Sequence, residues 1–407
     1  LAMTRLMGEQ IALDTGVKVT VSDMEIARGG KSYTADTLRI LHEEHPDDEL
    51  WLLMGTDMFL TFQYWYKPDE IVRYAGLCAF GRTKKDGEEL FAPQRKYLGQ
   101  RFPGSRVVTM TLPNLVDVSS TELRARIPKR ETDGLLAPAV LGYIYRKHLY
   151  GTNLNLERLT LEDLRPIALS YLKAKRIPHV LGTEQTAKAL AEKYGEKARF
   201  AALLHDSTKR LSMEEQLAMC EHYHIELDEL EKKALKLLHA KTGAALARDV
   251  FGADDEIYNA ILWHTTGKAN MTLLEKVIYL ADYIEPNRDF DGVEDLRKVV
   301  WEDIDRGLAM GLTMTVEEIG MAILEHGFQG RTDGYIQLTA IMQENGELEL
   351  HLRDDATTFN PFDMDTRRAS QDGDFDMDSM GVLIIKKRAK EFFYRRYQGF
   401  NTLIIRI

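Results

Sequence analysis

The chain has 407 residues, of which 44% are hydrophobic and 29% charged, a balance typical of soluble globular proteins with two or three cores. Its net charge of −11 argues against nucleic acid or anionic membrane as a partner, and no apolar run is expected to reach the roughly 20 residues of a membrane span. The two cysteines, Cys78 and Cys220, indicate a reducing cytoplasm rather than a disulfide scaffold.

Strands and helices alternate over residues 1–150, which predicts a parallel, doubly wound α/β sheet that binds ligands at the carboxyl ends of its strands. One helix of this region is expected to begin at Ser119 or Ser120, either of which is a good N-cap, with Glu122 nearby to favour the first turn. The other expected elements are an extended segment over 17–28, a helix over 32–46, a buried strand followed by a turn over 49–59, and buried strands over 77–83 and 105–113.

Three groups in this region could hold a ligand. The hydroxyls and N–H groups at residues 119–121, with Arg124, suit a phosphate, although an ordinary N-cap is the favoured interpretation. The segment Gly55-Thr56-Asp57 follows a buried strand, where a plain turn is an equal alternative. Trp65 could stack on an aromatic ring, but a tryptophan in such a position is usually part of the core.

The stretches EIARGGKSYTADTL, MGTDMFLTFQYW and VDVSSTELRARI resemble the nicotinate mononucleotide adenylyltransferase family, over roughly residues 1–150. The resemblance implies that SSTELR lines an ATP site and that SYTADTL, GTD and the tryptophan hold the pyridine nucleotide. The residues so implicated are Thr34, Asp57, Trp65, Ser120, Thr121 and Arg124.

This region departs from that family in one respect. The family's opening strand and its glycine-rich loop with two histidines, GxFxPxHxGH, have no counterpart in the sequence, which opens at Leu1 inside an expected helix. That loop orients the triphosphate and supplies the main stabilisation of the transition state. We therefore expect a partial, Rossmann-like nucleotidyltransferase domain that binds nucleotide weakly without turnover.

Residues 151–159 form a polar joint, and strong helical periodicity from about residue 160 to 312 predicts an all-α domain. Asp228 and the pair Asp254–Asp255 are expected near helix starts, and Gly195 and Gly252 near helix ends.

Four histidines and two aspartates lie in the helical surroundings of this domain, where burial of a polar residue is costly. Each histidine alone is more often a structural residue, but six ligand-type residues in one domain favour a shared metal centre. Imidazole with carboxylate suits iron, manganese, zinc or cobalt rather than calcium. In contrast, His222 and His224 lie in a polar stretch and are expected to be solvated. The six expected ligands are His179, His205, Asp206, His239, His264 and Asp282.

The adjacent pair His205-Asp206 allows Asp206 to bridge two ions. His179, His205 and Asp282 would then bind one ion, and His239 and His264 the other. Two ions a few ångströms apart activate water at neutral pH and stabilise the oxygens of a phosphoryl transfer.

The pattern H…HD…H…H…D resembles the HD phosphohydrolase superfamily. Within it, HVLGTEQTAKALA, LLHDSTK and LWHTTGKANMTLLEKVIYLADYIEPNRDFDGVEDLR resemble the bacterial YqeK-like symmetrical diadenosine tetraphosphatases, over roughly residues 160–312. The resemblance implies hydrolysis of Ap4A to two ADP with two divalent metal ions, iron being the expected metal. The expected partner is thus a small-molecule nucleotide rather than nucleic acid or membrane, and a homodimer is left open.

Cationic and hydroxyl groups near the expected metal ligands fit a polyphosphate substrate. Lys209 follows Asp206 by one turn and Arg288 follows Asp282, and we expect these two cations to assist Asp206 in catalysis. A turn rich in hydroxyl and N–H groups is expected to bind the substrate, with a solvated Lys268 as an equal alternative. This turn consists of Thr265, Thr266, Gly267 and Lys268.

Residues 313–407 are expected to form an α+β sandwich, with a hairpin turning at Asn345-Gly346 and a flexible acidic stretch over 373–380. EEIGMAILEHG, LRDDATTFNPF and SMGVLIIKK resemble the histidine-kinase-like ATPase domain of anti-sigma-factor type. The resemblance implies that Asp354 or Asp355 contacts adenine and that Gly381 is the glycine of the lid.

Two departures characterise this last region. Ala322 stands where the family has its magnesium-ligating asparagine, and the first helix of the domain is not evident. We therefore expect a partial or degenerate nucleotide-binding module, with a purely structural interaction domain as the alternative.

The leading interpretation of the whole chain is a metal-dependent hydrolase of dinucleoside polyphosphates. The second is adenylyl transfer to nicotinate mononucleotide, and the third is a non-enzymatic, nucleotide-responsive regulator.

Overall fold

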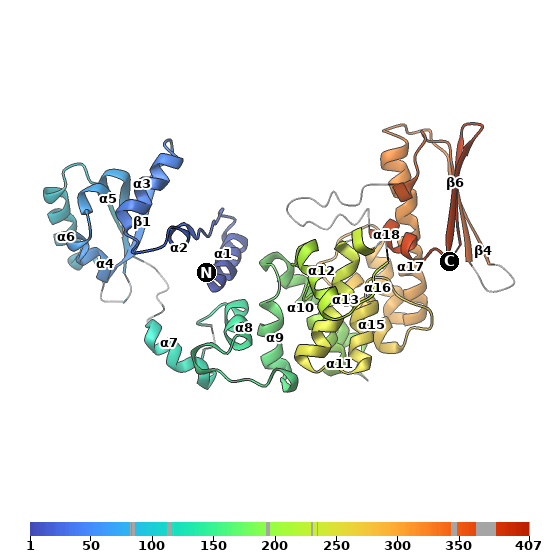
Figure 1. Ribbon diagram of the computed structural model, residues 1–407, viewed down its shortest axis with the longest axis horizontal. Helices are drawn as coiled ribbons and strands as arrows, with labels where there is room; N and C mark the ends of the chain where they lie inside the picture. The colour runs from blue at the N-terminus through green and yellow to red at the C-terminus, as the bar shows by residue number, and fades with distance from the viewer. Residues whose placement is uncertain are drawn as a thin grey trace. The chain divides into compact units, whose positions relative to one another are not determined.

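The computed structural model describes residues 1–407 except 82, 84–85, 112–115, 117, 133, 193–195, 229–230, 234, 343–347, 364–379 and 407. The described chain forms two compact units (Figure 1). The first comprises Leu1–Gly8, Gly16–Ala137 and Tyr150–Thr152, and the second comprises Glu9–Thr15, Pro138–Leu149 and Asn153–Ile407. Helix α1 (Ala2–Thr15) contributes residues to both units.

The first unit contains a parallel sheet of three strands in the order β1-β2-β3, which confirms the α/β expectation. The expected extended segment over 17–28 is wrong in its second half, because Met24–Arg28 forms helix α2. Its residues are good helix formers, and Glu25 lies in the first turn, where a negative charge is stabilising. The elements are α2, α3 (Thr34–Glu44), β1 (Leu50–Gly55), α4 (Thr56–Leu60), α5 (Pro68–Tyr74), β2 (Ala75–Phe80), α6 (Glu88–Arg101), β3 (Val107–Met110) and α7 (Ser120–Arg126).

The core of the first unit lies on one face of this sheet. Leu77 and Met54 of the strands join residues of α3, α4, α5 and α6 in a single buried cluster. The doubly wound expectation requires both faces to be covered. In the part of the chain that the structure describes, the opposite face instead bears exposed apolar side chains, namely Trp51, Leu53, Val108 and Met110.

The second unit begins with helices, as the periodicity predicts. Several of them start at side chains that cap the first turn, including Thr160, Asp254 and Thr272. The helices are α8 (Pro138–Arg146), α9 (Leu161–Leu169), α10 (Ile177–Leu190), α11 (Glu196–Leu204), α12 (Met213–His222), α13 (Leu235–Phe251), α14 (Asp255–Trp263), α15 (Leu273–Ile284), α16 (Val293–Glu302) and α17 (Ile304–Ala322).

Helix α8 belongs to this second unit, whereas the sequence led us to end the first domain at residue 150. The reason is a close crossing of α8 and α9 at Gly142. A Cβ atom at position 142 would lie 1.7 Å from the carbonyl oxygen of Pro166. Only a glycine therefore lets the two helices approach this closely.

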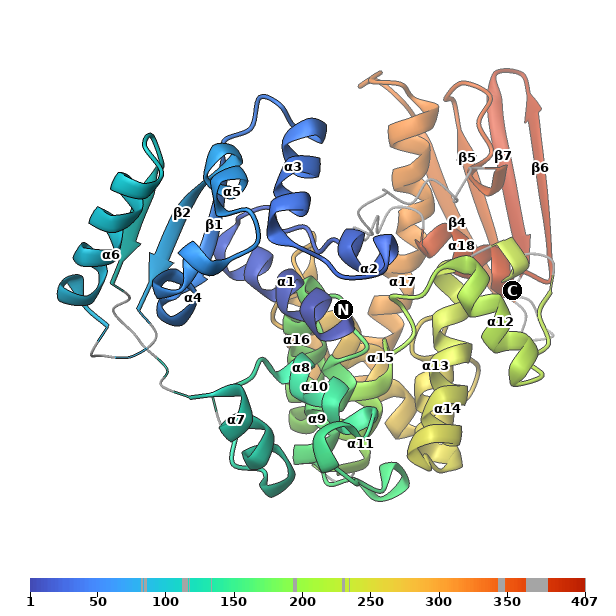
Figure 2. The same cartoon turned by 60° about the vertical axis from the view of Figure 1, so that its left-hand side comes forward.

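The second unit ends in a four-stranded antiparallel sheet of order β4-β5-β7-β6, packed against α17 and α18 (Figure 2). Leu352 and Ile405 of the strands meet Val382 of α18 in its core. The expected turn at Asn345-Gly346 lies outside the described residues, as does the acidic stretch apart from Met380. The elements are β4 (Ile336–Met342), β5 (Leu348–Asp354), α18 (Met380–Arg388), β6 (Glu391–Tyr397) and β7 (Phe400–Arg406).

Helix α17 joins the helices of the second unit to its sheet and continues as a turn of π-helix over Ile323–Gly327. The expected domain boundary at 312–313 falls inside this helix. Contrary to our reading of the sequence, Ile304–Gly327 is long and apolar enough for a membrane span by length and composition. Packing accounts for part of this apolarity, because Leu308 and Met314 contact the core of α15 and α16, and Ile319 lies in the core of the sheet. Only 35% of the apolar window is buried.

Candidate metal centre

The six expected ligands come from five helices of the second unit. His179 lies in the first turn of α10, His205 and Asp206 directly follow α11, and His239 lies in α13. His264 is the C-cap of α14, and Asp282 lies in the last turn of α15. The structure brings all six together.

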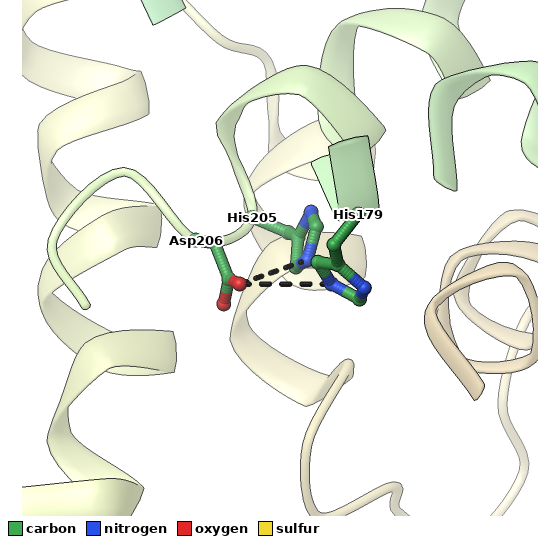
Figure 3. A group of neighbouring side chains, drawn as sticks. All are labelled: His179, His205 and Asp206. Carbon is green, nitrogen blue, oxygen red and sulfur yellow. Dashed lines mark ion pairs between the residues drawn. The ribbon is translucent and has the colours of Figure 1, made fainter. Parts of the chain in front are cut away.

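Asp206 lies at the middle of the cluster, and its two carboxylate oxygens face different histidines. Its Oδ2 atom lies 3.7 Å from His179 Nε2 and 3.5 Å from His205 Nε2 (Figure 3). Its Oδ1 atom lies 3.4 Å from His239 Nε2 and 4.0 Å from His264 Nε2. One carboxylate therefore separates two groups of imidazoles.

Asp282 adds a second carboxylate on the side of His179 and His205. Its Oδ1 atom lies 2.9 Å from His179 Nε2 and 3.7 Å from His205 Nε2. On the other side, the Nε2 atoms of His239 and His264 are 3.2 Å apart. Three overlapping sets of three donors result, and within each set the donor atoms lie within 4.8 Å of one another.

The atoms that converge in this cluster are buried polar atoms. Within the described part of the chain, His179 Nε2, His205 Nε2 and Asp206 Oδ1 make no hydrogen bond of good geometry, although Asp282 and Lys209 lie at ion-pair distance from His179 and Asp206. Such atoms are costly to bury unless something else satisfies them. Their arrangement fits a divalent cation bound between them.

The protonation states of the cluster also fit a cation. Burial lowers the pKa of His205 to about 3 and lowers the pKa values of His239 and His264. Burial alone would raise the pKa of Asp206, but the charges of Arg176 and Lys209 hold it well below its usual value. Neutral imidazoles beside an ionised carboxylate are the forms in which these side chains bind metals.

Three cationic side chains contact the two aspartates. Lys209 Nζ lies 3.1 Å from Asp206 Oδ1, and an Arg288 guanidinium nitrogen lies 2.7 Å from Asp282 Oδ1. Burial and the neighbouring Arg176 lower the pKa of Lys209 to about 7.

Arg176 is the third cation, and we did not identify it from the sequence. Its Nε donates to Asp206 Oδ2 at 2.7 Å. Its position three residues before His179, at the start of α10, was the available signal, because residues three apart share a helix face.

The expected substrate turn adjoins the His239–His264 side of the cluster. Thr265 Oγ1 lies 3.1 Å from His264 Nε2, and Gly267 has a φ of +59°, which favours glycine. The Thr266 carbonyl accepts hydrogen bonds from Arg388 at 3.3 Å, while Lys268 pairs with the buried Glu275 at 2.8 Å.

Of the six residues implicated in the first unit, three lie on α7 and the other three lie on separate segments. Thr34 begins α3 and Asp57 lies in the first turn of α4, directly after β1. Trp65 packs against the core beside Phe62, at 5.6 Å between ring centroids. Of the α7 group, Ser119 caps the helix by accepting from Glu122 N, and Arg124 lies 5.6 Å from the Tyr150 ring. Ser120 and Thr121 occupy the first turn of α7.

The two candidate adenine contacts in the C-terminal part have different surroundings. Asp354 ends β5, is buried, and accepts from Asn401 Nδ2 at 2.6 Å, while Asp355 pairs with Arg331 at 2.5 Å. Gly381 is buried in the first turn of α18, and Ala322 is buried in the core of the sheet.

The helical region of the second unit matches a known family. The HD domain family matches residues 176–287. The symmetrical bis(5'-nucleosyl)-tetraphosphatase of Bacillus subtilis is 40% identical over 159 residues, which are 38% of this chain and 85% of that protein. The chain belongs to this family.

The first unit matches a different family. The cytidylyltransferase-like family matches residues 3–126. A protein of Herpetosiphon aurantiacus named "Probable nicotinate-nucleotide adenylyltransferase" is 34% identical and covers 37% of this chain and 73% of its own length. A Mycoplasma genitalium protein named "Probable nicotinate-nucleotide adenylyltransferase/Ap4A hydrolase" is 26% identical over 69% of this chain and 72% of its own length. Both regions thus occur together in a relative.

Proposed function

We propose that the HD region hydrolyses dinucleoside polyphosphates, converting Ap4A and water to two ADP, with two divalent metal ions. The observation that carries this proposal is the placement of Asp206, whose two oxygens face two separate groups of histidines. His179, His205 and Asp282 would hold one ion, and His239 and His264 the other, with Asp206 between them. The name of the Bacillus subtilis relative supports the reaction.

The residues around the cluster fit a polyphosphate. Bound divalent ions would supply water activation at neutral pH and would stabilise the oxygens of an in-line displacement. A guanidinium group can donate two parallel hydrogen bonds to a phosphate group. Arg176 and Arg288 would therefore orient the phosphate chain. Lys209 would assist at the charge of the departing ADP, and the turn of Thr265, Thr266, Gly267 and Lys268 would bind the nucleotide.

Imidazole and carboxylate ligands suit first-row transition metals, and we propose iron, with manganese, cobalt and zinc as alternatives.

We also propose that the protein is cytoplasmic, since both cysteines are free thiols in the structure.

A second activity, adenylyl transfer to nicotinate mononucleotide, is proposed as the alternative for the first unit. Its support is the parallel sheet together with the printed name of the Herpetosiphon relative. Formation of a dinucleotide from ATP and nicotinate mononucleotide would demonstrate it. Nucleotide binding in both flanking regions without turnover in any assay would instead favour a regulator.

The proposed hydrolysis is tested by Asp206→Ala, with His222→Ala as the matched control because His222 is an exposed histidine of the same unit. We expect the metal-loaded protein to release ADP as the sole nucleotide product from Ap4A. Loss of the shared ligand should lower the rate about a thousandfold or more, corresponding to several kcal/mol of transition-state stabilisation. The measurements are metal content by elemental analysis and product analysis by chromatography.

The control should retain both metal and rate. Metal-loaded protein that leaves Ap4A intact would contradict the proposal, as would an Asp206→Ala variant with undiminished ADP release.

A further inference from the structure

Glu285 is a buried carboxylate next to the metal cluster. It is the C-cap of α15, three residues after Asp282, and only 1% of its surface is exposed. Its Oε1 atom lies 3.0 Å from Nδ1 of His179, the ring nitrogen opposite to the one that faces Asp206 and Asp282. Glu285 therefore contacts His179, a proposed metal ligand, at the ring nitrogen that does not face the cluster.

The second oxygen of Glu285 has donors of its own. The backbone N–H and the side-chain amide of Asn287 both donate to Oε2, at 2.8 Å each. The same amide nitrogen also donates to the carbonyl oxygen of Pro178, at the start of α10. Asn287 thus ties the end of α15 to the helix that carries His179.

Gly182 leaves the space that this carboxylate occupies. A Cβ atom at position 182 would lie 2.3 Å from Glu285 Oε2 and 3.0 Å from Asn287 Nδ2. Any larger residue on this face of α10 would displace Glu285. His179 and Gly182 of α10, together with Asn287 in the loop after α15, therefore hold the carboxylate in one place.

The partner of His179 differs in kind from those of two other histidines in the cluster. His205 Nδ1 lies 2.7 Å from the Ala202 carbonyl oxygen, and His264 Nδ1 lies 2.6 Å from the Ile261 carbonyl oxygen. Each of these carbonyls is three residues earlier in the chain. His179 meets an ionisable side chain from another helix instead, and a carboxylate raises the basicity of an imidazole ligand more than a carbonyl does.

We infer that Glu285 is a positioning residue for the metal site of His179, His205, Asp206 and Asp282. By accepting the Nδ1 proton of His179, it fixes the tautomer whose Nε2 lone pair points into the cluster. It would thereby set the affinity of that site without touching the substrate. This inference rests on the proposed metal-dependent function.

The test replaces Glu285 by glutamine. A glutamine offers one acceptor oxygen where the carboxylate offers two, so it cannot satisfy both His179 and Asn287. The matched control is Glu184→Gln, which changes a second buried glutamate that lies in α10. Glu184 pairs with Arg165 at 2.6 Å and with Arg199 at 2.9 Å, away from the histidines.

The measurement is Mn²⁺ binding to the metal-free protein, followed by the Mn²⁺ concentration that gives half-maximal Ap4A hydrolysis. For Glu285→Gln we expect one of two equivalents to bind about 10- to 100-fold more weakly, as for other outer partners of metal ligands. The half-maximal Mn²⁺ concentration should rise by the same factor, and the rate at saturating Mn²⁺ should stay close to that of the original protein. Glu184→Gln should bind both equivalents normally.

A second variant, Gly182→Ala, displaces the carboxylate without altering any polar group and should weaken the same equivalent. It guards against a folding defect of Glu285→Gln, which circular dichroism would reveal. If the original protein binds two equivalents and both Glu285→Gln and Gly182→Ala bind them equally well, the inference is overturned while the proposed function stands. An original protein without Mn²⁺ binding would instead overturn the proposed function.

Discussion

At the scale of single residues, Arg176 and Glu285 contact two of the six ligand-type side chains, Asp206 and His179, from outside the cluster. His205 and Asp206 are adjacent, and all six are ligand-type residues in an apolar helical context. Glu285 and His179 are 106 positions apart, and their contact depends on how α10 and α15 pack. Helical periodicity indicates which face of its own helix a residue occupies, but it does not indicate which other helix packs against that face.

Arg176 offers a prediction at this scale, because its guanidinium contacts the carboxylate of Asp206. Arg176→Lys retains the charge but loses the planar, forked set of donors. We expect kcat/KM for Ap4A to fall about 10- to 100-fold with metal content unchanged.

The control for this variant is Arg165→Lys. Arg165 makes a similar two-point contact with Glu184, through Nε and a terminal nitrogen. This variant should lower stability and leave kcat/KM alone. Equal activity of Arg176→Lys and the original protein would show that Arg176 serves stability only.

At the scale of helices and strands, the sequence predicted a helix boundary correctly where one capping residue or one glycine determines it. Thr272 begins α15 with a capping box to Glu275, and Asp254 begins α14. Gly252, with a φ of +64°, follows the end of α13 at Phe251, as expected from its sequence position. The segment 17–28 has the alternating apolar residues of a strand, but its second half is helical and it pairs with no strand of the described sheet.

The crossing of α8 and α9 gives a prediction about packing. Gly142→Ala would place a methyl group against the backbone of Pro166, so we expect a loss of about 1–3 kcal/mol in the free energy of unfolding. The same substitution at Gly320 in α17 should stabilise by up to about 1 kcal/mol, because the added Cβ atom would lie within 4 Å of no described atom outside the local helix backbone.

Urea unfolding of the two alanine variants measures both effects. Opposite signs would support a tight α8–α9 crossing. An unfolding midpoint for Gly142→Ala at or above that of the original protein would argue that α8 does not pack on α9 in this way.

At the scale of the whole chain, the order of a parallel sheet, a helical region and an antiparallel sheet agrees with the expectation from sequence. The domain limits differ from it, because α8 packs with later helices and α17 serves two cores. A domain boundary depends on which helices pack together. The change in sequence pattern near residues 150 and 312 does not contain that information.

A pH-dependent prediction concerns the contact between α18 and the helical region. Lys387 pairs with Asp228 and also with Glu231, at 3.0 Å, and Lys241 pairs with Glu231 at 2.8 Å. Burial alone would raise the pKa of Glu231, but hydrogen bonds from Lys241, the Asp228 backbone and Lys387 hold it below its usual value. The ionised form is therefore favoured by folding, so its stabilisation is present at neutral pH and is lost as the pH falls through the lowered pKa.

We expect Glu231→Gln to lower the free energy of unfolding by about 2 kcal/mol at neutral pH. The difference from the original protein should shrink as the pH is lowered below the usual glutamate pKa, about 4.3. Urea titrations across this range measure it, and the exposed Glu214→Gln serves as the control. A difference that stays constant with pH would contradict the ion-pair explanation.

Because α17 contributes residues to two cores, the rotation of one core relative to the other about the helix axis depends on the number of residues between them. Met314 faces the core formed with α15 and α16, and Ile319, five residues later, faces the core of the sheet. Each residue inserted between them would rotate the sheet about the helix axis by about 100° and shift it by about 1.5 Å. Seven inserted residues would nearly restore the rotation, with a drift of about 20°. The number of residues between the two cores is thus as much a part of the structure as their chemical character.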